Sequence, residues 1–597
     1  MGIWKHTSGN NGFVYPGTDI ISAISHKIEI SDQNEAALEV SRNRLTLSAL
    51  LCCLSFIIVA SRLLNLTLAD ANSNLGPIQH STNTAEIKVR ADIVDRKNRI
   101  IATTLPLANL WANPKKIINI KQTVDLLISA LPELNHERLT QRLQSQNSFI
   151  YIKRNLGPLE HQKINDLGLP GVYFEESRKR VHPYDNLFSH TVGITDTDNI
   201  GMSGLESYFN KRLFKVEKPL TLSLDIGVQS TIHNILSKSV KRFKATGGST
   251  VVMAANTGQI LGLVSLPDFN IYNNKENSSN FFNTAIQGTF EMGSTFKLFT
   301  AAMAIDEGLV NLNTIFDASK PLKIANHVIH DFHPKNRPLT VREILIYSSN
   351  IGAAQMASEV GPENQKKFLD RLNLLSALDL ETHSLGRPQY PKVWRPIDTA
   401  VVSYGHGISV TPVHVALAVS ALVNGGTLPK PTLLKNCCIL GENNTRVISA
   451  KTSKIMRSLM RQVVTEGSGK NADVPGYNVG GKTGSAEIAE LGQYSNNRLN
   501  TSFVAAFPMD NPKYVVFVML EDPKGLKEHN NQALAGWNAA PTAANIIKEI
   551  SPILGVYPNS QKIDKPRPSS LVQARLSSGK NIARAQHDRS RGPNAIR

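Results

Sequence analysis

The chain has 597 residues, with 65 Lys and Arg against 48 Asp and Glu, which gives a net charge of +17 at pH 7. This length is too great for one hydrophobic core and predicts three or four structural units. Charged residues (19%) and glycines (39) occur at ordinary globular levels, so the composition excludes a fibrous or wholly disordered chain.

The first segment predicts a membrane anchor. Residues 1–44 are polar without clear periodicity, and an apolar helix is expected over 45–68. At ~1.5 Å per residue this helix is roughly 35 Å long, enough to cross a bilayer. Arg42 and Arg44 precede it, so the positive-inside rule places 1–44 in the cytoplasm and the bulk of the chain outside. A cleaved signal peptide is the alternative, since Ala69-Asp70-Ala71 resembles a cleavage site, but such peptides have a much shorter polar start.

Residues 69–84 have the composition of a linker, and 85–215 predict a structural or docking module. A strand is expected at Ile87–Arg90, and Asp95 to Asn98 favour a hairpin turn. Strand and helix patterns then mix, with a helical stretch around 122–145. The sequence of this module contains no cluster with the spacing of a metal site or a catalytic triad.

Residues 220–555 predict one α+β domain with an antiparallel sheet, because strand patterns at both ends enclose a mainly helical middle. Amphipathic helices are expected over Ile226–Lys241 and Ala540–Ile550. The expected strands are Gly248–Ala255, Ile260–Ser265, Tyr477–Ser485, Thr501–Phe507 and Lys513–Leu520.

The tail, 559–597, has a different composition. It holds nine Lys and Arg against Asp564 and Asp588, together with Pro, Ser and Gly, so it is expected to be disordered. Nucleic acid is not an expected partner for an extracytoplasmic chain. Acidic wall polymers or anionic headgroups are the candidates for a weak attraction, and a plain solubilising tail is the alternative.

The first candidate active-site motif is Ser294-x-x-Lys297, which follows the turn Met292-Gly293 and opens an apolar helix. A spacing of three puts both side chains on one helix face. Burial and the helix N-terminus both favour the neutral amine of Lys297, which can then take a proton from Ser294. A free lysine titrates near ~10.4, so service as a base near pH 7 requires a shift of roughly three units, about 4 kcal/mol.

Ser-x-x-Lys alone is a weak signal, and its second occurrence, Ser577 to Lys580, lies in the polar tail and is interpreted as chance. Two further motifs follow the first in a fixed order: Ser348-Ser349-Asn350, at a junction between two helices, and Lys482-Thr483-Gly484, in an expected strand. The three together match the serine penicillin-recognising set.

On these motifs the sequence resembles a class B penicillin-binding protein, a monofunctional, membrane-anchored peptidoglycan D,D-transpeptidase, over most of 45–555. The resemblance also rests on Arg90–Arg96, Gly201-x-x-Gly204-x-Glu206, Pro267–Asn270 and Tyr404–Pro412. Ile152–Arg154, Leu169–Val172 and Arg180–Pro183 are more similar to the cell-division subfamily than to the elongation subfamily. Ala91, Asn98 and His182 depart from the family pattern, all in the first module, and so concern partner contacts rather than chemistry.

The resemblance implies a transpeptidase domain like that of serine β-lactamases, an antiparallel sheet with a helical subdomain. An elongated α+β pedestal of the penicillin-binding-protein dimerisation type and one N-terminal transmembrane helix would precede it. The implied location is the cytoplasmic (inner) membrane at the division septum, with the bulk of the chain periplasmic. The implied partners are division-complex proteins, including a glycan polymerase, and no cofactor or metal is implied.

The resemblance also assigns the acyl-transfer residues. Ser294 would attack the carbonyl of the penultimate D-alanine of a stem peptide, with Lys297 as base, and release the terminal D-alanine. Ser348 would pass the proton to the leaving amine, and Asn350 would hydrogen-bond the substrate amide. A second stem peptide's amine would resolve the acyl-enzyme, and β-lactams, which imitate the D-Ala-D-Ala end, would be trapped on Ser294.

The third motif would bind the substrate. Lys482 would supply positive potential that keeps Lys297 neutral and, with Thr483, would hold the terminal carboxylate. Gly484 would let the strand lie close to the substrate. The backbone N–H groups of Ser294 and Ser485 would form the oxyanion hole, each contributing roughly 3–4 kcal/mol.

Several alternatives stay open. One is an elongation-type transpeptidase. Another is a β-lactam sensor or hydrolase on the same fold, although 298–480 lacks a Glu-x-x-Leu-Asn base motif. A non-catalytic division scaffold is the third. His406, between two glycines, is interpreted as a turn histidine with satisfied hydrogen bonds rather than a cleft residue.

Overall fold

The computed structural model describes residues 46–62, 89–215, 218–272, 278–435, 445–490 and 493–559. The chain divides into two compact units, 1–87 and 88–597. The first unit is described only as a helix over 46–62. Residues 1–44, the ends of the expected 45–68 anchor, the 69–84 linker and the tail beyond Asn559 lie outside the described residues. Within the described ranges, no helix combines the length and apolarity that a membrane crossing requires.

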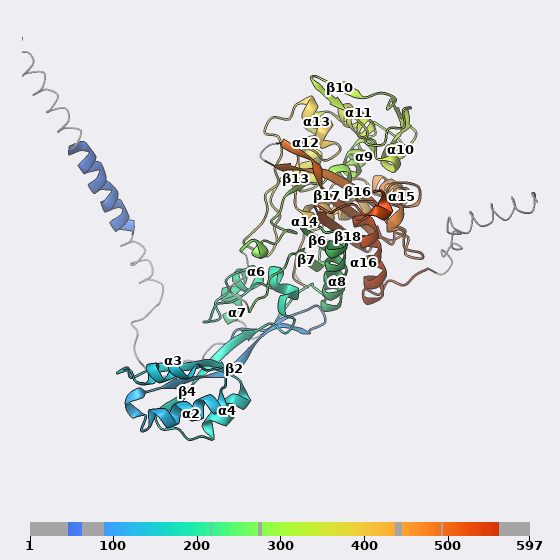
Figure 1. The fold of residues 1–597 in the computed structure, drawn as a ribbon. Coiled ribbons are helices and arrows are strands. Elements are labelled where there is room, and N and C mark those ends of the chain that lie inside the picture. The colour runs from blue at the N-terminus through green and yellow to red at the C-terminus, as the bar shows by residue number, and fades with distance from the viewer. Residues whose placement is uncertain are drawn as a thin grey trace, which may run out of the picture. The chain divides into compact units, whose positions relative to one another are not determined.

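The second unit begins with a five-stranded sheet in the order β3-β2-β1-β5, with β4 also paired to β2 (Figure 1). The hairpin turn at Asp95 to Asn98 is present: Asn98 has φ 63°, and the Asp95 carboxylate accepts from the backbone N–H groups of Lys97 and Arg99. The long pair β2 and β4 is antiparallel, with Trp111 opposite Tyr173. The strands are β1 (Ile93–Val94), β2 (Ile100–Ala112), β3 (Ile150–Leu156), β4 (Val172–Val181) and β5 (Leu220–Thr221).

Two local expectations for this region need correction. The helical stretch around 122–145 is two helices, α2 (Ile120–Ala130) and α3 (His136–Leu143), because Asn119 and Asn135 each cap a separate N-terminus. Of the expected strand at 87–90, the described residues Val89 and Arg90 are not in a strand. The Arg90 side chain is instead buried in an ion pair. The remaining helices here are α4 (Pro158–Asn165), α5 (Ser189–Val192), α6 (Gly204–Tyr208) and α7 (Asn210–Lys215).

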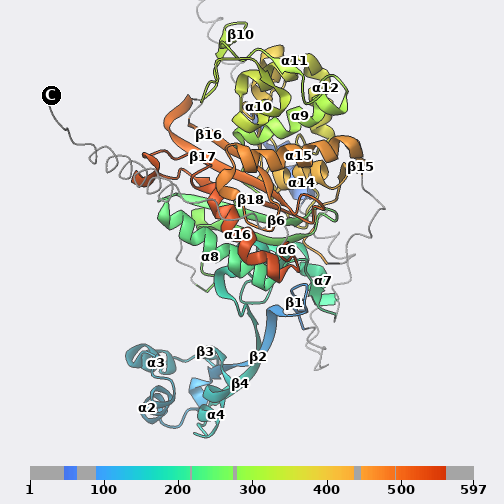
Figure 2. The same cartoon turned by 90° about the vertical axis from the view of Figure 1, so that its right-hand side faces the viewer.

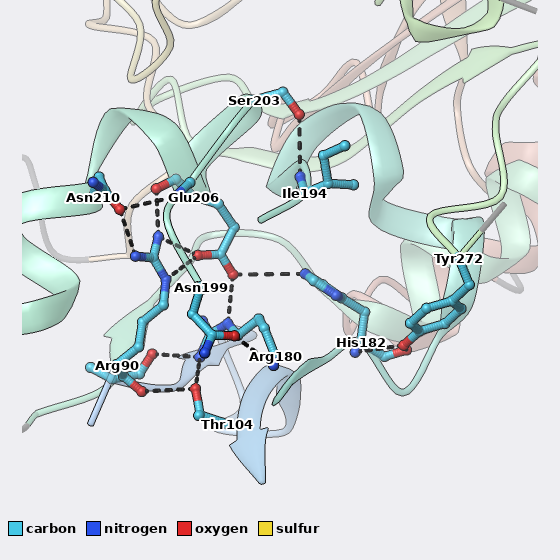
Figure 3. A network of polar contacts seen from close by, with 12 residues as sticks. Arg90, Thr104, Arg180, His182, Ile194, Asn199, Ser203, Glu206, Asn210 and Tyr272 are labelled. Atoms are coloured by element: carbon cyan, nitrogen blue, oxygen red, sulfur yellow. Dashed lines mark hydrogen bonds and ion pairs between the residues drawn. The ribbon is translucent and has the colours of Figure 1, made fainter. Parts of the chain in front are cut away.

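A buried polar network ties together segments of this region that are distant in sequence (Figure 3). Glu206 lies 2.6 Å from the guanidinium of Arg90 and 2.7 Å from that of Arg180, and the His182 ring lies 3.7 Å away. Although burial opposes the charged carboxylate, its contacts with His182 and both arginines hold the pKa of Glu206 at about 2. Tyr272, which follows strand β7 (Ile260–Leu266) in the chain, accepts from the backbone N–H of His182 at 3.0 Å. The network thus connects the end of β4 to the chain segment that follows β7.

The rest of the unit is built on a second sheet, with strand order β16-β17-β18-β6-β7 and antiparallel pairing throughout. Helices α8 and α16 lie side by side on one face, and α14 packs on β6 and β18 from the other side (Figures 1 and 2). The expected antiparallel α+β sheet is therefore present. The strands are β6 (Gly247–Ala254), β7 (Ile260–Leu266), β16 (Gly480–Glu490), β17 (Gln493–Phe507) and β18 (Tyr514–Glu521); the helices are α8 (Ile226–Arg242), α14 (Pro412–Val423), α15 (Ala450–Glu466) and α16 (Ala539–Ile553).

A helical subdomain fills the chain between β7 and α14. Its buried centre is α9 (Lys297–Asp306), in which every residue from Lys297 to Ala304 is buried. The other helices are α10 (Val341–Tyr347), α11 (Asn350–Val360), α12 (Pro362–Arg371) and α13 (Pro396–Val402). The same part of the chain contains three short antiparallel strand pairs: β8 (Phe290–Glu291) with β13 (Ser409–Val410), β9 (Ile315–Phe316) with β12 (Leu339–Thr340), and β10 (Leu322–Ile324) with β11 (His327–Ile329). A further pair, β14 (Thr427–Leu428) with β15 (Thr445–Arg446), follows α14.

Candidate active site

Ser294 lies on a tight turn rather than on a regular α-helix as expected, and Lys297 is the first residue of the helix that follows. Residues Gly293–Phe296 form one 3-10 turn, and α9 begins at Lys297. Side chains three apart eclipse each other in a 3-10 turn, which brings the amine directly beside the hydroxyl. The Lys297 Nζ lies 2.8 Å from the Ser294 Oγ, and Lys297 is 1% exposed.

The second motif is held in a strained turn between α10 and α11. A capping box of Thr340 and Glu343 fixes the start of α10, which ends at Ser348 in the left-handed region, with φ 61° and ψ 42°. Non-glycine residues rarely adopt that conformation unless the surroundings impose it. The turn places the Ser348 carbonyl 2.7 Å and the Asn350 Oδ1 2.6 Å from the Lys297 amine.

Lys482 completes a chain of polar groups across the site. Its Nζ donates to the Ser348 Oγ at 2.9 Å, and that hydroxyl also lies 3.2 Å from the Lys297 Nζ. The structure therefore brings together Ser294, Lys297, Ser348, Asn350 and Lys482. They come from three separate parts of the fold: the turn before α9 with the first residue of α9, the α10–α11 junction, and the edge strand β16.

The electrostatics of this cluster favour a neutral base. Burial, followed by the field of Lys482, holds the pKa of Lys297 well below its ordinary value, and Asp331 opposes part of that shift. Burial also lowers the pKa of Lys482 to about 7. Two ammonium groups that share one hydroxyl neighbour repel each other, so the charge of Lys482 adds to burial in favouring the neutral form of Lys297. The neutral amine can accept the proton of Ser294.

Close backbone approach explains the glycines around the nucleophile. A Cβ at Gly484 would lie 2.4 Å from the Met292 carbonyl oxygen and 2.6 Å from the Ser502 Oγ. A Cβ at Gly293, which has φ +53°, would lie 2.6 Å from the Ser485 carbonyl oxygen. The backbone of Ser485 therefore lies against the nucleophile turn, as a shared oxyanion hole would require.

The side chains that follow Lys482 are anchored by loops outside the strand. The Thr483 Oγ1 lies 2.7 Å from the Ser468 Oγ, and the Ser485 Oγ accepts from the backbone N–H of Ala535 at 3.2 Å. Ser468 belongs to none of the three motifs, and the sequence did not predict its contact with Thr483.

Asp331 is the most important residue that the sequence did not reveal. Its carboxylate accepts from the Ser349 hydroxyl at 2.7 Å and from the backbone N–H groups of Asn350 and Ile351 at 2.5 and 3.0 Å. The partial positive charge at the N-terminus of α11 stabilises this carboxylate. The sequence spacing did not link Asp331 to the second motif. Asp331 lies in the loop after β11, and only the tertiary fold places that loop beside Ser349.

His406 lies closer to the site than expected. Burial, and the positive charge that Lys297 carries when it is protonated, lower the pKa of His406 to about 4, and its Nδ1 lies 3.6 Å from a carboxylate oxygen of Glu291. The imidazole is therefore neutral at pH 7, and the interpretation of His406 as a turn residue stays a prediction. In the described ranges, no group of three or more His, Cys, Asp or Glu could hold a metal ion.

The chain is similar to known proteins over most of its length. Residues 248–548 match the penicillin binding protein transpeptidase domain, and 88–214 match the penicillin-binding protein dimerisation domain. The chain is 35% identical over 483 residues to the probable peptidoglycan D,D-transpeptidase FtsI of Caulobacter vibrioides, covering 78% of this chain and 82% of the relative. It is 30% identical over 505 residues to the probable peptidoglycan D,D-transpeptidase PenA of Neisseria meningitidis, covering 79% and 85%.

A solved structure shares the fold. The crystal structure of a candidate peptidoglycan glycosyltransferase from Atopobium parvulum superposes with a TM-score of 0.61 at 22% identity, covering 79% of this chain and 98% of that one.

Proposed function

The chain belongs to the penicillin-binding protein transpeptidase family and is a peptidoglycan D,D-transpeptidase; we propose that it cross-links septal cell wall through an acyl-enzyme on Ser294. The observation that carries the proposed chemistry is the buried Lys297 amine 2.8 Å from the Ser294 hydroxyl, under the field of Lys482. We also propose the domain division given by the sequence, a pedestal over 85–215 and a transpeptidase domain over 220–555.

In the acylation step, the Ser294 Oγ attacks the carbonyl carbon of the penultimate D-alanine while its proton moves to the Lys297 Nζ. The backbone N–H groups of Ser294 and Ser485 stabilise the oxyanion. The C–N bond then breaks, and Ser348 gives its proton to the leaving amine. Lys297, 3.2 Å from the Ser348 Oγ, returns a proton to that hydroxyl. The products are the acyl-enzyme and free D-alanine.

Substrate is held by the edge of β16. An edge strand has unpaired backbone groups that can pair with an extended peptide. Lys482 and Thr483 hold the terminal carboxylate, and Asn350 hydrogen-bonds the substrate amide. In the second step the amine of another stem peptide attacks the ester carbonyl and loses a proton to Lys297. The ester C–O bond then breaks, and Lys297, 2.8 Å from the Ser294 Oγ, passes that proton to the departing oxygen. A β-lactam acylates the same oxygen but keeps its leaving group attached, so the ester persists.

We propose that the protein is held in the cytoplasmic membrane by 45–68 and works in the division complex beside a glycan polymerase. The support is the similarity to relatives named FtsI and the apolar composition of 45–68. Localisation of a fluorescent fusion tests this part: enrichment at the septum is expected, and a uniform side-wall pattern would favour the elongation role.

Labelling with fluorescent penicillin tests the chemistry. Purified protein should form one long-lived adduct, which peptide mass spectrometry should map to Ser294. Ser294→Ala should remove the label, whereas Ser577→Ala, a matched change in the other Ser-x-x-Lys pattern, should retain it. Rapid turnover of the adduct would instead indicate a hydrolase. Full growth support by Ser294→Ala in cells would establish the scaffold alternative.

A further inference from the structure

A large cavity lies where α8 and α16 meet the loop before α16, and the proposed reaction uses none of its residues. Its volume is about 810 Å³, which is within the range of ligand sites in proteins. Its lining mixes one exposed indole with amides, ammonium groups, the guanidinium of Arg242 and the carboxylate of Glu549. The lining residues that matter here are Asn234, Lys238, Asn471, Trp537, Asn545 and Lys548.

Trp537 gives the cavity a rigid aromatic surface. The side chain is 40% exposed, unusual for so large an apolar group. The His529 ring stacks on it with centroids 4.7 Å apart and an interplanar angle of 17°, which restricts the indole to one orientation. The face of an indole carries partial negative charge, and the C–H bonds of a sugar ring carry partial positive charge. A restricted, exposed indole is therefore a suitable stacking surface for a pyranose.

The polar lining suits an amino sugar. Among the hydrogen bonds of the described residues, none involves the side-chain amides of Asn234 and Asn545, so both can donate to and accept from hydroxyl and acetamido groups. Lys238 and Lys548 add positive charge toward carboxylates. An apolar ligand that displaced water from the cavity would leave these amide and ammonium groups without hydrogen-bond partners, which is unfavourable.

The cavity adjoins the active-site strand. Ala535 donates its backbone N–H to the Ser485 Oγ, the Gly536 carbonyl accepts from Asn471, and the next residue is Trp537. Two residue steps span at most ~8 Å. An extended stem peptide of four or five residues spans roughly 13–18 Å, so a peptide attached to a sugar in this cavity can reach β16.

We propose that this cavity binds an amino-sugar segment of the glycan strand whose stem peptide is engaged at β16. The inference rests on the proposed function, because it assigns a second contact to the same substrate. It makes the cavity a specificity site: a stem peptide carried on glycan is held at two points, and a free peptide at one.

Calorimetric titration of the full-length protein in detergent with the tetramer of N-acetylglucosamine tests the inference. We expect saturable binding that weakens about tenfold in Trp537→Ala, because the stacking surface is removed. Asn545→Ala changes an exposed residue of α16, so it keeps the fold and should weaken binding severalfold. Trp111→Ala, a matched change in the pedestal, should bind as the unaltered protein does.

The test separates this inference from the proposed function. Binding that both cavity variants leave unchanged would overturn the inference, and so would no binding of the saccharide to the unaltered protein. A division protein that occupies the cavity while the saccharide does not bind would also overturn it. Acylation of the unaltered protein by penicillin is measured separately, and its failure would refute the proposed function whatever the titration shows.

Discussion

Asp331→Asn provides the most informative test of how the site is built. The native carboxylate accepts three hydrogen bonds, from the Ser349 hydroxyl and the backbone N–H groups of Asn350 and Ile351. The amide has one acceptor oxygen, and its NH2 group cannot accept. At least one charge-assisted bond is lost, at roughly 1.5–3 kcal/mol. If that free energy appears in the transition state, acylation slows by roughly 10- to 150-fold.

The pH profile gives a second, independent readout. The negative charge of Asp331 raises the pKa of Lys297 against the larger effects of burial and Lys482. Removal of that charge lowers the Lys297 pKa further, so the neutral base persists to lower pH. The acid limb of the acylation rate should therefore move to lower pH although the maximum rate falls.

The measurement is the second-order rate constant of penicillin acylation between about pH 5 and 9, a range that extends to both sides of neutral pH. Asp317→Asn is the matched control, since the Asp317 carboxylate accepts from the backbone N–H of Ser319 within its own turn. A rate within threefold of the unaltered protein, or an acid limb that moves to higher pH, would refute the assigned role of Asp331.

Three further predictions concern Lys482, Gly484 and the buried Glu206 network. Burial is the largest cause of the lowered Lys297 pKa, and Lys482→Met removes the second cause, the Lys482 charge. The acid limb of acylation should therefore move to higher pH, opposite to Asp331→Asn; an unmoved limb would contradict the electrostatic coupling. Gly484→Ala places a Cβ 2.4 Å from a carbonyl oxygen, and calorimetry should show a stability loss of about 1–3 kcal/mol with reduced penicillin labelling; unchanged behaviour would contradict the close approach. Glu206→Gln leaves two buried guanidinium groups without their anion and should cost about 3–5 kcal/mol in chemical denaturation. The Glu206 pKa of about 2 is below the unfolded value, so its stabilisation is present above about pH 4.5 and is lost as the pH falls toward 2.

The long elements were predictable because their patterns are local. The amphipathic helix expected over Ile226–Lys241 is α8, and the strands expected at 248–255 and 513–520 are β6 and β18 within one residue. The helix expected from Ser294 begins later, at Lys297. The backbone of Ser485 packs against Gly293, at the start of the 3-10 turn. These two residues are far apart in the sequence, so local helix propensity cannot predict their contact.

The sequence by itself determined the family and the types of chemical group available: a serine, two lysines, a second serine and an asparagine in three ordered motifs. Residue type and short spacing are local properties, so they can be read without coordinates. Only the tertiary structure decided which further residues join them. Asp331, Ser468 and the Ala535 N–H reach the site across loops, and the left-handed turn at Ser348 aims its hydroxyl between both amines. Burial likewise decided the charge of Lys297, because the environment of an amine is a property of everything packed around it.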